Sequence, residues 1–502
     1  IIYTLKTDNE GQRAKGIIQL LLTIPSFYSS ITGHLHHNYA HLAKVYGMSE
    51  QTSDRVRFTS YRSRSDRISI SFSNMNSATA VLLACAVTIV TGSGNLQVVN
   101  EWTLLQYDVP FNYPNADSYK PEVTISTGIE IGWDRIFITT PRLFNGNPAT
   151  LAWVPRNRAG VNYDTHKSPL LQAYPNWEWH SEASSGDILT TSTPNCSSLI
   201  SVFRVRADRC NRLWVLDSGV MDSIETFKTV CPPKLLVFDM RTDRVVRSVT
   251  LPAEILRPNT LLTNLVIDDQ VEVSHLQDGF LGDCDNVFVY MTDSTNPGIL
   301  VYDARRDTAW RLSHPYMFPD PDFGTFSVAG ESFTLMDGVI GLALSPFGSV
   351  GRRLYFQPFA SDRLFSVPTS ALKAGPNLGD DADLPVSLVG HKSSQAAPLA
   401  VDPKDGALIF SPVSETALAT WIPGSVEHGV LAYSPEELQF VLDIRSADRD
   451  QGAIWVISTR LQRFFKKTLD KREVNIRIMR IVRVPEFLPY AFNNNNSLLL
   501  FK

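Results

Sequence analysis

The sequence lacks three features that mark common classes of protein: a strong charge of one sign, a zinc-type cysteine spacing and a membrane-length apolar run. Its 46 Lys and Arg residues nearly balance 51 Asp and Glu residues, for a net charge of −5. Nucleic-acid surfaces and electrostatic membrane anchors need a basic excess, so we predict neither partner and favour a small or neutral ligand. The five cysteines form no Cys-x-x-Cys pattern. A histidine cluster has no acidic or cysteine partner nearby, so we predict no metal and no cofactor; it comprises His34, His36, His37 and His41.

Catalytic signatures are also missing. We find no nucleophile–base set, no phosphate-binding loop and no paired carboxylates at a defined spacing. Calcium-dependent lactonases need recurrent acidic ligands, and the chain offers none at equivalent positions. What is abundant is apolar residues, at 43% of the chain with 10% aromatic. The composition therefore predicts a large hydrophobic core but does not indicate a particular reaction.

A short apolar phrase occurs six times, at intervals of roughly 45 to 80 residues. The copies are DRIFITT (134–140), NRLWVLDSG (211–219), DNVFVYMTDS (285–294), RRLYFQPFAS (352–361), GALIFSPVSE (406–415) and GAIWVISTR (452–460). Most are followed by a second strand-like run, and Pro-, Gly- and Asp-rich turns separate the pairs. One small sheet cannot bury both its faces, so the copies must stack. The sequence predicts an all-β fold, a six-bladed β-propeller, with the run 96–107 as a strand that closes the ring.

The N-terminal part differs from the repeats. Residues 78–90 form an apolar run that is too short to span a membrane, and small residues follow it at 92–94. This pattern is typical of a secretory signal that begins at Met75, although no Lys or Arg follows the Met. We therefore predict an upstream segment outside the fold at 1–74, a signal peptide at 75–93, the propeller at 94–486 and a C-terminal tail at 487–502.

Cysteine usage agrees with export. Loss of Cys85 with the signal leaves an even number, namely Cys196, Cys210, Cys231 and Cys284. Two disulfides are expected, and three pairings are open. Cys210 and Cys284 stand at equivalent places in two repeats, while the most local pairing joins Cys196 to Cys210 and Cys231 to Cys284. Asn195 and Asn495 each begin a glycosylation sequon.

Four longer phrases carry a family resemblance. They lie at 208–220 (DRCNRLWVLDSGV), 231–252 (CPPKLLVFDMRTDRVVRSVTLP), 314–333 (HPYMFPDPDFGTFSVAGESF) and 341–373 (GLALSPFGSVGRRLYFQPFASDRLFSVPTSALK). These phrases resemble the insect yellow/major royal jelly protein family, its yellow branch more closely, over about residues 101–485. The resemblance implies a secreted six-bladed propeller. It also implies a choice of functions: pigmentation, dopachrome conversion, binding of serotonin and catecholamines, or a nutritional or lipid-binding role.

Candidate ligand-binding residues follow if the six phrases are the innermost strands. The polar residues at their ends would then line the channel: Thr139, Asp217, Thr292, Asp293, Gln357, Ser411 and Ser458. An aromatic amine needs an anion for its ammonium group and aromatic faces for its ring. We predict Asp217 as the counter-ion, and Gln357, Gln395 and Thr292 as polar contacts. The ring faces would come from Phe288, Phe356 and Phe410. The competing interpretation makes the Phe residues interblade core and lets the polar groups satisfy one another.

Dopachrome conversion would need a base with a near-neutral pKa. The candidates are His180 and the nearby Glu178, although a His beside Trp177 and Trp179 is more often packed structurally. The sequence therefore predicts a secreted, extracellular yellow-like protein of the melanin and cuticle pathway. Its channel would bind catecholamine- or indole-type molecules, with dopachrome conversion as a candidate activity. The alternative is a non-catalytic amine-binding or structural cuticle protein.

Overall fold

The computed structural model describes residues 60–62, 66–68, 95–113, 119–156, 166–167, 169–180, 195–270, 282–349, 351–375 and 384–482. The chain divides into two units, 1–92 and 93–502. In the first, β1 (Ser60–Arg62) pairs with β2 (Asp66–Ile68). The predicted signal peptide, the C-terminal tail, the histidine cluster and Asn495 lie outside the described residues, and so does nearly all of the predicted upstream segment.

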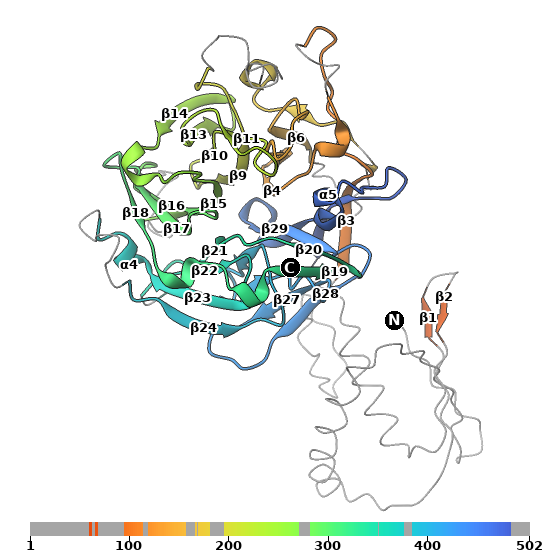
Figure 1. The fold of residues 1–502 in the computed structure, drawn as a ribbon. Helices are drawn as coiled ribbons and strands as arrows, with labels where there is room; N and C mark the ends of the chain where they lie inside the picture. Colours follow the sequence, from red (N-terminus) through yellow and green to blue (C-terminus); the bar gives the residue numbers. More distant parts are fainter. Residues whose placement is uncertain are drawn as a thin grey trace, which may run out of the picture. The chain divides into compact units, whose positions relative to one another are not determined.

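Six antiparallel sheets in the second unit form the blades of a β-propeller (Figure 1). Blade 1 comprises β4 (Gly128–Ile131), β5 (Arg135–Thr139), β6 (Leu151–Pro155) and β8 (Gln172–Ala173). Blade 2 comprises β9 (Val202–Ala207), β10 (Arg212–Asp217), β13 (Lys234–Asp239) and β14 (Arg244–Thr250). Blade 3 comprises β15 (Leu262–Asp269), β16 (Val287–Asp293), β17 (Gly298–Asp303) and β18 (Thr308–Leu312). Blade 4 comprises β21 (Val339–Leu344), β22 (Arg353–Pro358), β23 (Arg363–Pro368) and β24 (Ser387–His391). Blade 5 comprises β25 (Leu399–Val401), β26 (Leu408–Phe410), β27 (Ala417–Trp421) and β28 (Gly429–Tyr433). The all-β propeller prediction is confirmed.

Blade 6 joins the two ends of the ring. It comprises β29 (Phe440–Ala447), β30 (Ala453–Thr459), β31 (Ile476–Val482) and β3 (Asn95–Trp102), and the short β7 (His166–Lys167) adds in parallel. Strand β3 pairs antiparallel with β31, across almost the whole propeller sequence. Figure 1 shows the orange β3 beside the blue C-terminal elements. The closing strand expected within 96–107 is thus present, although it begins at residue 95 and ends at 102.

The innermost strands are the first strands of the blades, not the six repeat phrases. Strands β4, β9, β15, β21, β25 and β29 each contact the first strands of both flanking blades, and these contacts close a ring. The repeat phrases form β5, β10, β16, β22, β26 and β30, the second strand of each blade. The expectation that they are innermost is wrong. A second strand is paired on both edges and covered by blades on both faces, so it becomes the most continuously apolar strand.

The two disulfides do not follow the most local pairing. Cys196 bonds Cys231, and Cys210 bonds Cys284 with a Cα–Cα distance of 6.0 Å. Cys210 lies between the first two strands of blade 2, and Cys284 lies between the first two strands of blade 3. Equivalent turns of adjacent blades meet across the interface, so these cysteines are neighbours in space despite a sequence separation of 74. The local pairing was wrong for that reason.

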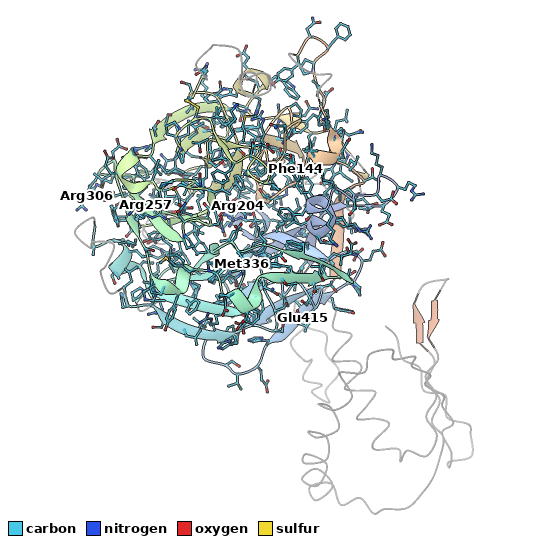
Figure 2. The ribbon with its side chains drawn as sticks, in the orientation of Figure 1. Phe144, Arg204, Arg257, Arg306, Met336 and Glu415 are labelled. Carbon is cyan, nitrogen blue, oxygen red and sulfur yellow. A yellow bond between two sulfur atoms is a disulfide. The ribbon has the colours of Figure 1, made fainter. Side chains whose placement is uncertain are left out.

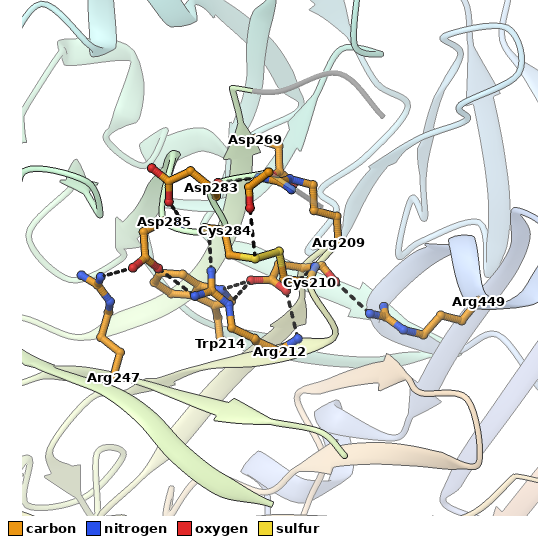
Figure 3. Close-up of a disulfide and its surroundings, with 12 residues drawn as sticks. Arg209, Cys210, Arg212, Trp214, Arg247, Asp269, Asp283, Cys284, Asp285 and Arg449 are labelled. Carbon is orange, nitrogen blue, oxygen red and sulfur yellow. Dashed lines mark hydrogen bonds and ion pairs between the residues drawn. A yellow bond between two sulfur atoms is a disulfide. The ribbon is translucent and has the colours of Figure 1, made fainter. Parts of the chain in front are cut away.

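Ion pairs surround the interblade disulfide (Figure 3). The Arg212 guanidinium, from blade 2, lies 2.7 Å from the Asp285 carboxylate of blade 3. It also donates to the carbonyl oxygen of Cys284. Covalent and ionic links therefore hold the same pair of blades together.

Removing the Cys210–Cys284 disulfide is expected to lower the free energy of unfolding by about 2–5 kcal/mol. The bond lowers the conformational entropy of the unfolded chain, because it joins two residues that are 74 positions apart in the sequence. Denaturant unfolding of the Cys210→Ser, Cys284→Ser double variant measures the loss. The Cys196→Ser, Cys231→Ser variant, whose bond spans 35 residues, is the matched control and should lose less. An unchanged stability would mean that the ion pairs alone hold the interface.

Helices are few and short. The two α-helices in the described part of the chain are α4 (Thr369–Leu372) and α5 (Leu461–Phe465), with single 3-10 turns between blades. In the described ranges no helix has the length and apolar character needed to cross a bilayer.

Candidate functional site

The residues predicted to line the channel gather at one mouth of the ring. In every blade the second strand runs antiparallel to the first, so its end lies beside the start of the innermost strand. The ends of the second strands carry Thr139, Asp217, Thr292, Asp293, Gln357 and Ser458, and Ser411 directly follows β26. The prediction therefore identified one mouth, although these residues stand one strand away from the channel axis.

A hairpin packs against this mouth. It is formed by β19 (Thr325–Val328) and β20 (Glu331–Thr334), which precede blade 4. The Gln395 amide donates hydrogen bonds of 2.8 Å to the carbonyl oxygens of Phe323 and Thr325. Gln395 therefore anchors the hairpin, and its predicted contact with a ligand stays a prediction.

An aromatic cluster forms the underside of this cover. The Phe326 ring stacks on Phe333 at 5.2 Å and lies 4.7 Å from Phe359, which directly follows β22. Phe333 lies 6.0 Å from Phe440, the first residue of β29, and 5.2 Å from Phe465 of α5. These rings pack on one another, with Phe326 and Phe440 fully buried, and none of them was selected in the sequence analysis.

Charged side chains cross the channel deeper in the ring. The two carboxylate oxygens of Asp443 accept hydrogen bonds of 3.0 Å from Nη1 and Nη2 of Arg206. One of these oxygens also lies 2.8 Å from Arg204 Nη1. Glu130 pairs with Arg445 at 2.9 Å. We call these five residues, from β4, β9 and β29, the axial cluster; Figure 2 labels Arg204 near the middle of the ring. Paired charged side chains occupy this part of the channel, so a ligand ring is expected at the mouth rather than within the cluster.

Asp337 is a mouth residue that sequence reasoning missed. It stands two residues before β21, between the hairpin and the innermost strand of blade 4. Burial, together with the nearby Asp293 carboxylate, raises the pKa of Asp337 to about 7. Within the described ranges no side-chain partner neutralises it. Its sequence signal is an acidic residue just before an innermost strand. The predicted channel residues came instead from the ends of the repeat phrases, which form the second strands.

Two further polar atoms at this mouth are buried and lack hydrogen-bond partners in the described part of the chain. They are Ser294 Oγ, directly after β16, and Gln357 Oε1, near the end of β22. The amide nitrogen of Gln357 donates to the carbonyl oxygen of Ala396 at 2.9 Å, so its oxygen remains available. Both atoms could therefore form a hydrogen bond with a polar ligand at this mouth.

Asp217 is fully engaged in the structure. One oxygen accepts from the backbone N–H groups of Ser201 and Gly219, and the other accepts from Ile200 N–H and lies 3.0 Å from Lys234 Nζ. Although burial opposes ionisation, the Lys234 ammonium and these amides hold the pKa of Asp217 below its usual value. These contacts give Asp217 a structural role, in which it pairs with the buried Lys234 ammonium and accepts three backbone hydrogen bonds. Its role as the counter-ion of an amine stays a prediction.

Asp217→Asn is expected to lower the free energy of unfolding by about 3–5 kcal/mol, because it leaves the Lys234 ammonium buried without its anion. With a depressed folded pKa, the pair's contribution is present above about pH 4 and is lost as pH falls below it. Urea unfolding measures the effect, and the Asp217→Asn, Lys234→Met double variant should recover most of it. Normal stability combined with weaker dopamine binding would instead support the counter-ion role.

The remaining predicted ligand contacts lie in packed surroundings. Phe356 is fully buried between blades, 5.5 Å from the Phe365 ring. The Thr292 hydroxyl lies 3.3 Å from the Thr263 hydroxyl. Phe356 therefore occupies the interblade core, as the competing interpretation held, and ligand contact by these residues stays a prediction.

His180 and Glu178 lie on a 3-10 turn, Trp177–His180, next to blade 1. His180 is fully buried; its Nδ1 accepts from the Thr150 N–H, and its Nε2 lies 2.9 Å from the Tyr174 carbonyl oxygen. Burial, and secondarily the Arg142 charge, lowers the pKa of His180 to about 3. Such an imidazole stays neutral and held in place, which suits a structural residue better than a base. Glu178 is exposed, as is Asn195 of the first sequon.

A small pocket of about 100 Å³ lies beside α5. Its lining residues are Glu122, Val123, Phe144, Phe464, Lys467 and Leu469. Lys467 Nζ already lies 4.8 Å from the centre of the Phe144 ring. The pocket therefore combines two aromatic rings with one charge of each sign.

The ring and its covered mouth define a six-bladed β-propeller with a candidate small-molecule site at one end of the channel. Residues 200–485 match the family "Major royal jelly protein". The chain is 30% identical over 405 residues to "Dopaminechrome tautomerase" of Drosophila melanogaster, covering 77% of this chain and 81% of that protein. It is 31% identical to "Protein yellow" of Drosophila erecta and of Drosophila melanogaster, covering 79% of this chain and 71% of each relative. The chain belongs to the yellow/major royal jelly protein family, as the sequence resemblance predicted.

Proposed function

We propose that this protein binds catecholamine- and indole-type molecules at the covered mouth and tautomerises aminochromes in the melanin and cuticle pathway. The observation that carries the proposal is Asp337, a carboxyl group whose pKa is raised to about 7 at the mouth. The relative named dopaminechrome tautomerase aligns with 77% of the chain. Together they supply a base with the right proton affinity and a substrate class.

A tautomerase changes only the positions of protons and double bonds. In an aminochrome, protons leave the saturated carbons of the five-membered ring and arrive at the quinone oxygens, which gives the dihydroxyindole isomer without an oxidant or reductant. A general base whose pKa lies near the working pH serves this step best. Asp337 would take the carbon-bound proton, and the Ser294 hydroxyl, which lacks a hydrogen-bond partner among the described residues, would donate toward a quinone oxygen. The Phe326 and Phe333 rings would cover the bicyclic substrate.

The test is an assay of purified protein with dopaminechrome and with dopachrome, following loss of the aminochrome absorbance against buffer. Acceleration of either substrate supports the proposal. No acceleration over buffer, with the protein shown to be folded, would overturn the enzymatic part.

A non-catalytic amine-binding role is the second candidate, and the pocket beside α5 favours it. Glu122 could receive an ammonium group while Phe144 and Phe464 cover an aromatic ring. Titration calorimetry with dopamine and serotonin distinguishes the two sites. Phe464→Ala should weaken binding in the pocket, whereas Asp337→Asn should weaken binding at the mouth.

Secretion belongs to the same proposal. The two disulfides favour an oxidising compartment, and the family resemblance implies export. We propose a signal peptide at 75–93, a mature chain without residues 1–74, and glycosylation at Asn195 and Asn495. N-terminal sequencing of the secreted protein tests the first two points, since a mature chain that contains His34 would exclude them. Peptide mass spectrometry tests the glycans.

A further inference from the structure

We propose that the axial cluster binds one small monovalent anion, with Arg204 as its principal donor: a halide such as chloride, or the carboxylate of a ligand. The halide form is independent of the proposed function. The carboxylate form rests on it and narrows the substrate class to aminochromes that carry a carboxylate.

The first argument is charge. Within the described ranges the cluster contains three guanidinium groups, of Arg204, Arg206 and Arg445, and two carboxylates, of Glu130 and Asp443. All but Arg445 are at least nine-tenths buried as whole residues. One positive charge therefore remains uncompensated in a region of low dielectric, which is costly unless an anion accompanies it.

Every oxygen of the two carboxylates already accepts at least one hydrogen bond. Both oxygens of Asp443 contact Arg206, and one of them also contacts Arg204 and accepts the Ile129 N–H. In Glu130, one oxygen accepts the Ile131 N–H, while the other accepts the Ala207 N–H and pairs with Arg445. An acceptor for further guanidinium N–H groups must come from elsewhere.

The donors are available. Nε of Arg204, Arg206 and Arg445 is buried in each case and has no hydrogen-bond acceptor among the residues that the structure describes. Arg204 reaches the axis over Gly128, where an added Cβ would stand 2.8 Å from Arg204 Nη1. Three buried N–H groups without an acceptor therefore belong to one cluster, and an anion bound there would accept their hydrogen bonds.

The titration of Arg206 supports the same conclusion. Burial, and then the positive charges of Arg445 and Arg204, lowers the pKa of Arg206 to about 10 despite its contact with Asp443. A guanidinium with a bidentate carboxylate partner normally holds its proton more strongly than this. Burial is the largest cause of this shift, and the charges of Arg445 and Arg204 act in the same direction.

The site is within reach of a ligand at the mouth. Arg204 stands two residues from the start of β9, which corresponds to about 7 Å of strand. A carboxylate on the five-membered ring of a bicyclic aminochrome could extend toward Arg204 while the saturated carbons of that ring remain near Asp337 and the quinone remains near Ser294. Dopachrome carries such a carboxylate, and dopaminechrome lacks it.

The halide arm uses the wild-type protein. Thermal unfolding is compared in sodium bromide, sodium chloride and sodium gluconate at equal ionic strength, and bromide is located in crystals by its anomalous scattering. We expect a saturable rise of the midpoint in the halides and a bromide peak at hydrogen-bond distance from Arg204 Nε. Arg204→Met should weaken halide binding about tenfold or more. Arg353→Met, which alters an arginine that donates to Ser366 instead, should respond like the wild type.

The carboxylate arm compares two substrates. Arg204→Met should reduce kcat/KM for dopachrome about tenfold and for dopaminechrome less than about twofold, and chloride should compete only with dopachrome. Equal effects on both substrates, with bromide present at Arg204, would identify the anion as a halide. Equal midpoints in halide and gluconate, no bromide at Arg204 and no difference between the substrates would overturn the inference. If neither aminochrome is converted, the proposed function fails, and the bromide result still decides this inference.

Discussion

Asp337→Asn is expected to lower kcat for aminochrome tautomerisation by about 10²–10⁴-fold, the usual contribution of a positioned general base. The amide retains the size of the side chain but cannot accept the proton. The loss is measured as aminochrome disappearance at saturating substrate. Asp322→Asn, which changes an exposed aspartate before the same hairpin, should leave the rate unchanged. Wild-type activity in Asp337→Asn would remove Asp337 from the mechanism.

The pH dependence gives an independent measurement on the same residue. The wild-type kcat/KM is expected to rise through about pH 7, because the base is the ionised form of Asp337 and its pKa is raised to about 7. Stability should change in the opposite direction. The folded state holds this proton more tightly than the unfolded state, whose aspartate pKa is about 4, so the free energy of unfolding falls as pH rises between about 4 and 7. Asp337→Asn should abolish that fall while keeping the fold.

Asp443→Asn is expected to be the most destabilising single substitution in the channel, with a loss of about 3–5 kcal/mol in the free energy of unfolding. The change leaves Arg204 and Arg206 buried without the carboxylate that holds them. Although burial opposes its ionisation, the Arg204 and Arg206 charges hold the pKa of Asp443 below its usual value. Its stabilisation is thus present above about pH 4 and is lost as pH falls further.

Urea unfolding with matched variants isolates the role of Asp443. Asp470→Asn, which removes the acid of an exposed ion pair with Arg472, should change stability little. Adding Arg206→Met to Asp443→Asn should restore part of the loss, because one unpaired charge disappears. If Asp443→Asn unfolds at the wild-type midpoint, the cluster does not hold its charges in the paired form.

Much of the fold could be predicted because strand pairs have a strong local signal. The second strand of each blade is nearly all apolar, as in residues 212–217 and 287–293, and six copies require ring closure. The strand that completes blade 6 was expected from the run 96–107. The pairing of Cys210 with Cys284 could not be obtained in this way, because it depends on which turns meet across an interface. Sequence distance favoured the wrong partners.

The candidate site was only partly predictable. Residues such as Asp217, Thr292 and Gln357 lie near the ends of second strands, and their contact with a ligand stays a prediction. Whether a polar residue there is available depends on its partners. Asp217 accepts hydrogen bonds from Ile200, Ser201 and Gly219, whereas Asp337 has a raised pKa near Asp293. Nothing in the local sequence distinguishes these two aspartates.

The sequence by itself determined that this chain is a six-bladed propeller of the yellow/major royal jelly protein family, because strand periodicity and long family phrases are local properties. Only the tertiary structure decided which strands are innermost, which carboxylates are neutralised and which remain available. The physical reason is that these properties arise from contacts between blades. Asp443 meets Arg206 across 237 residues of sequence, and the ionisation of both depends on that meeting.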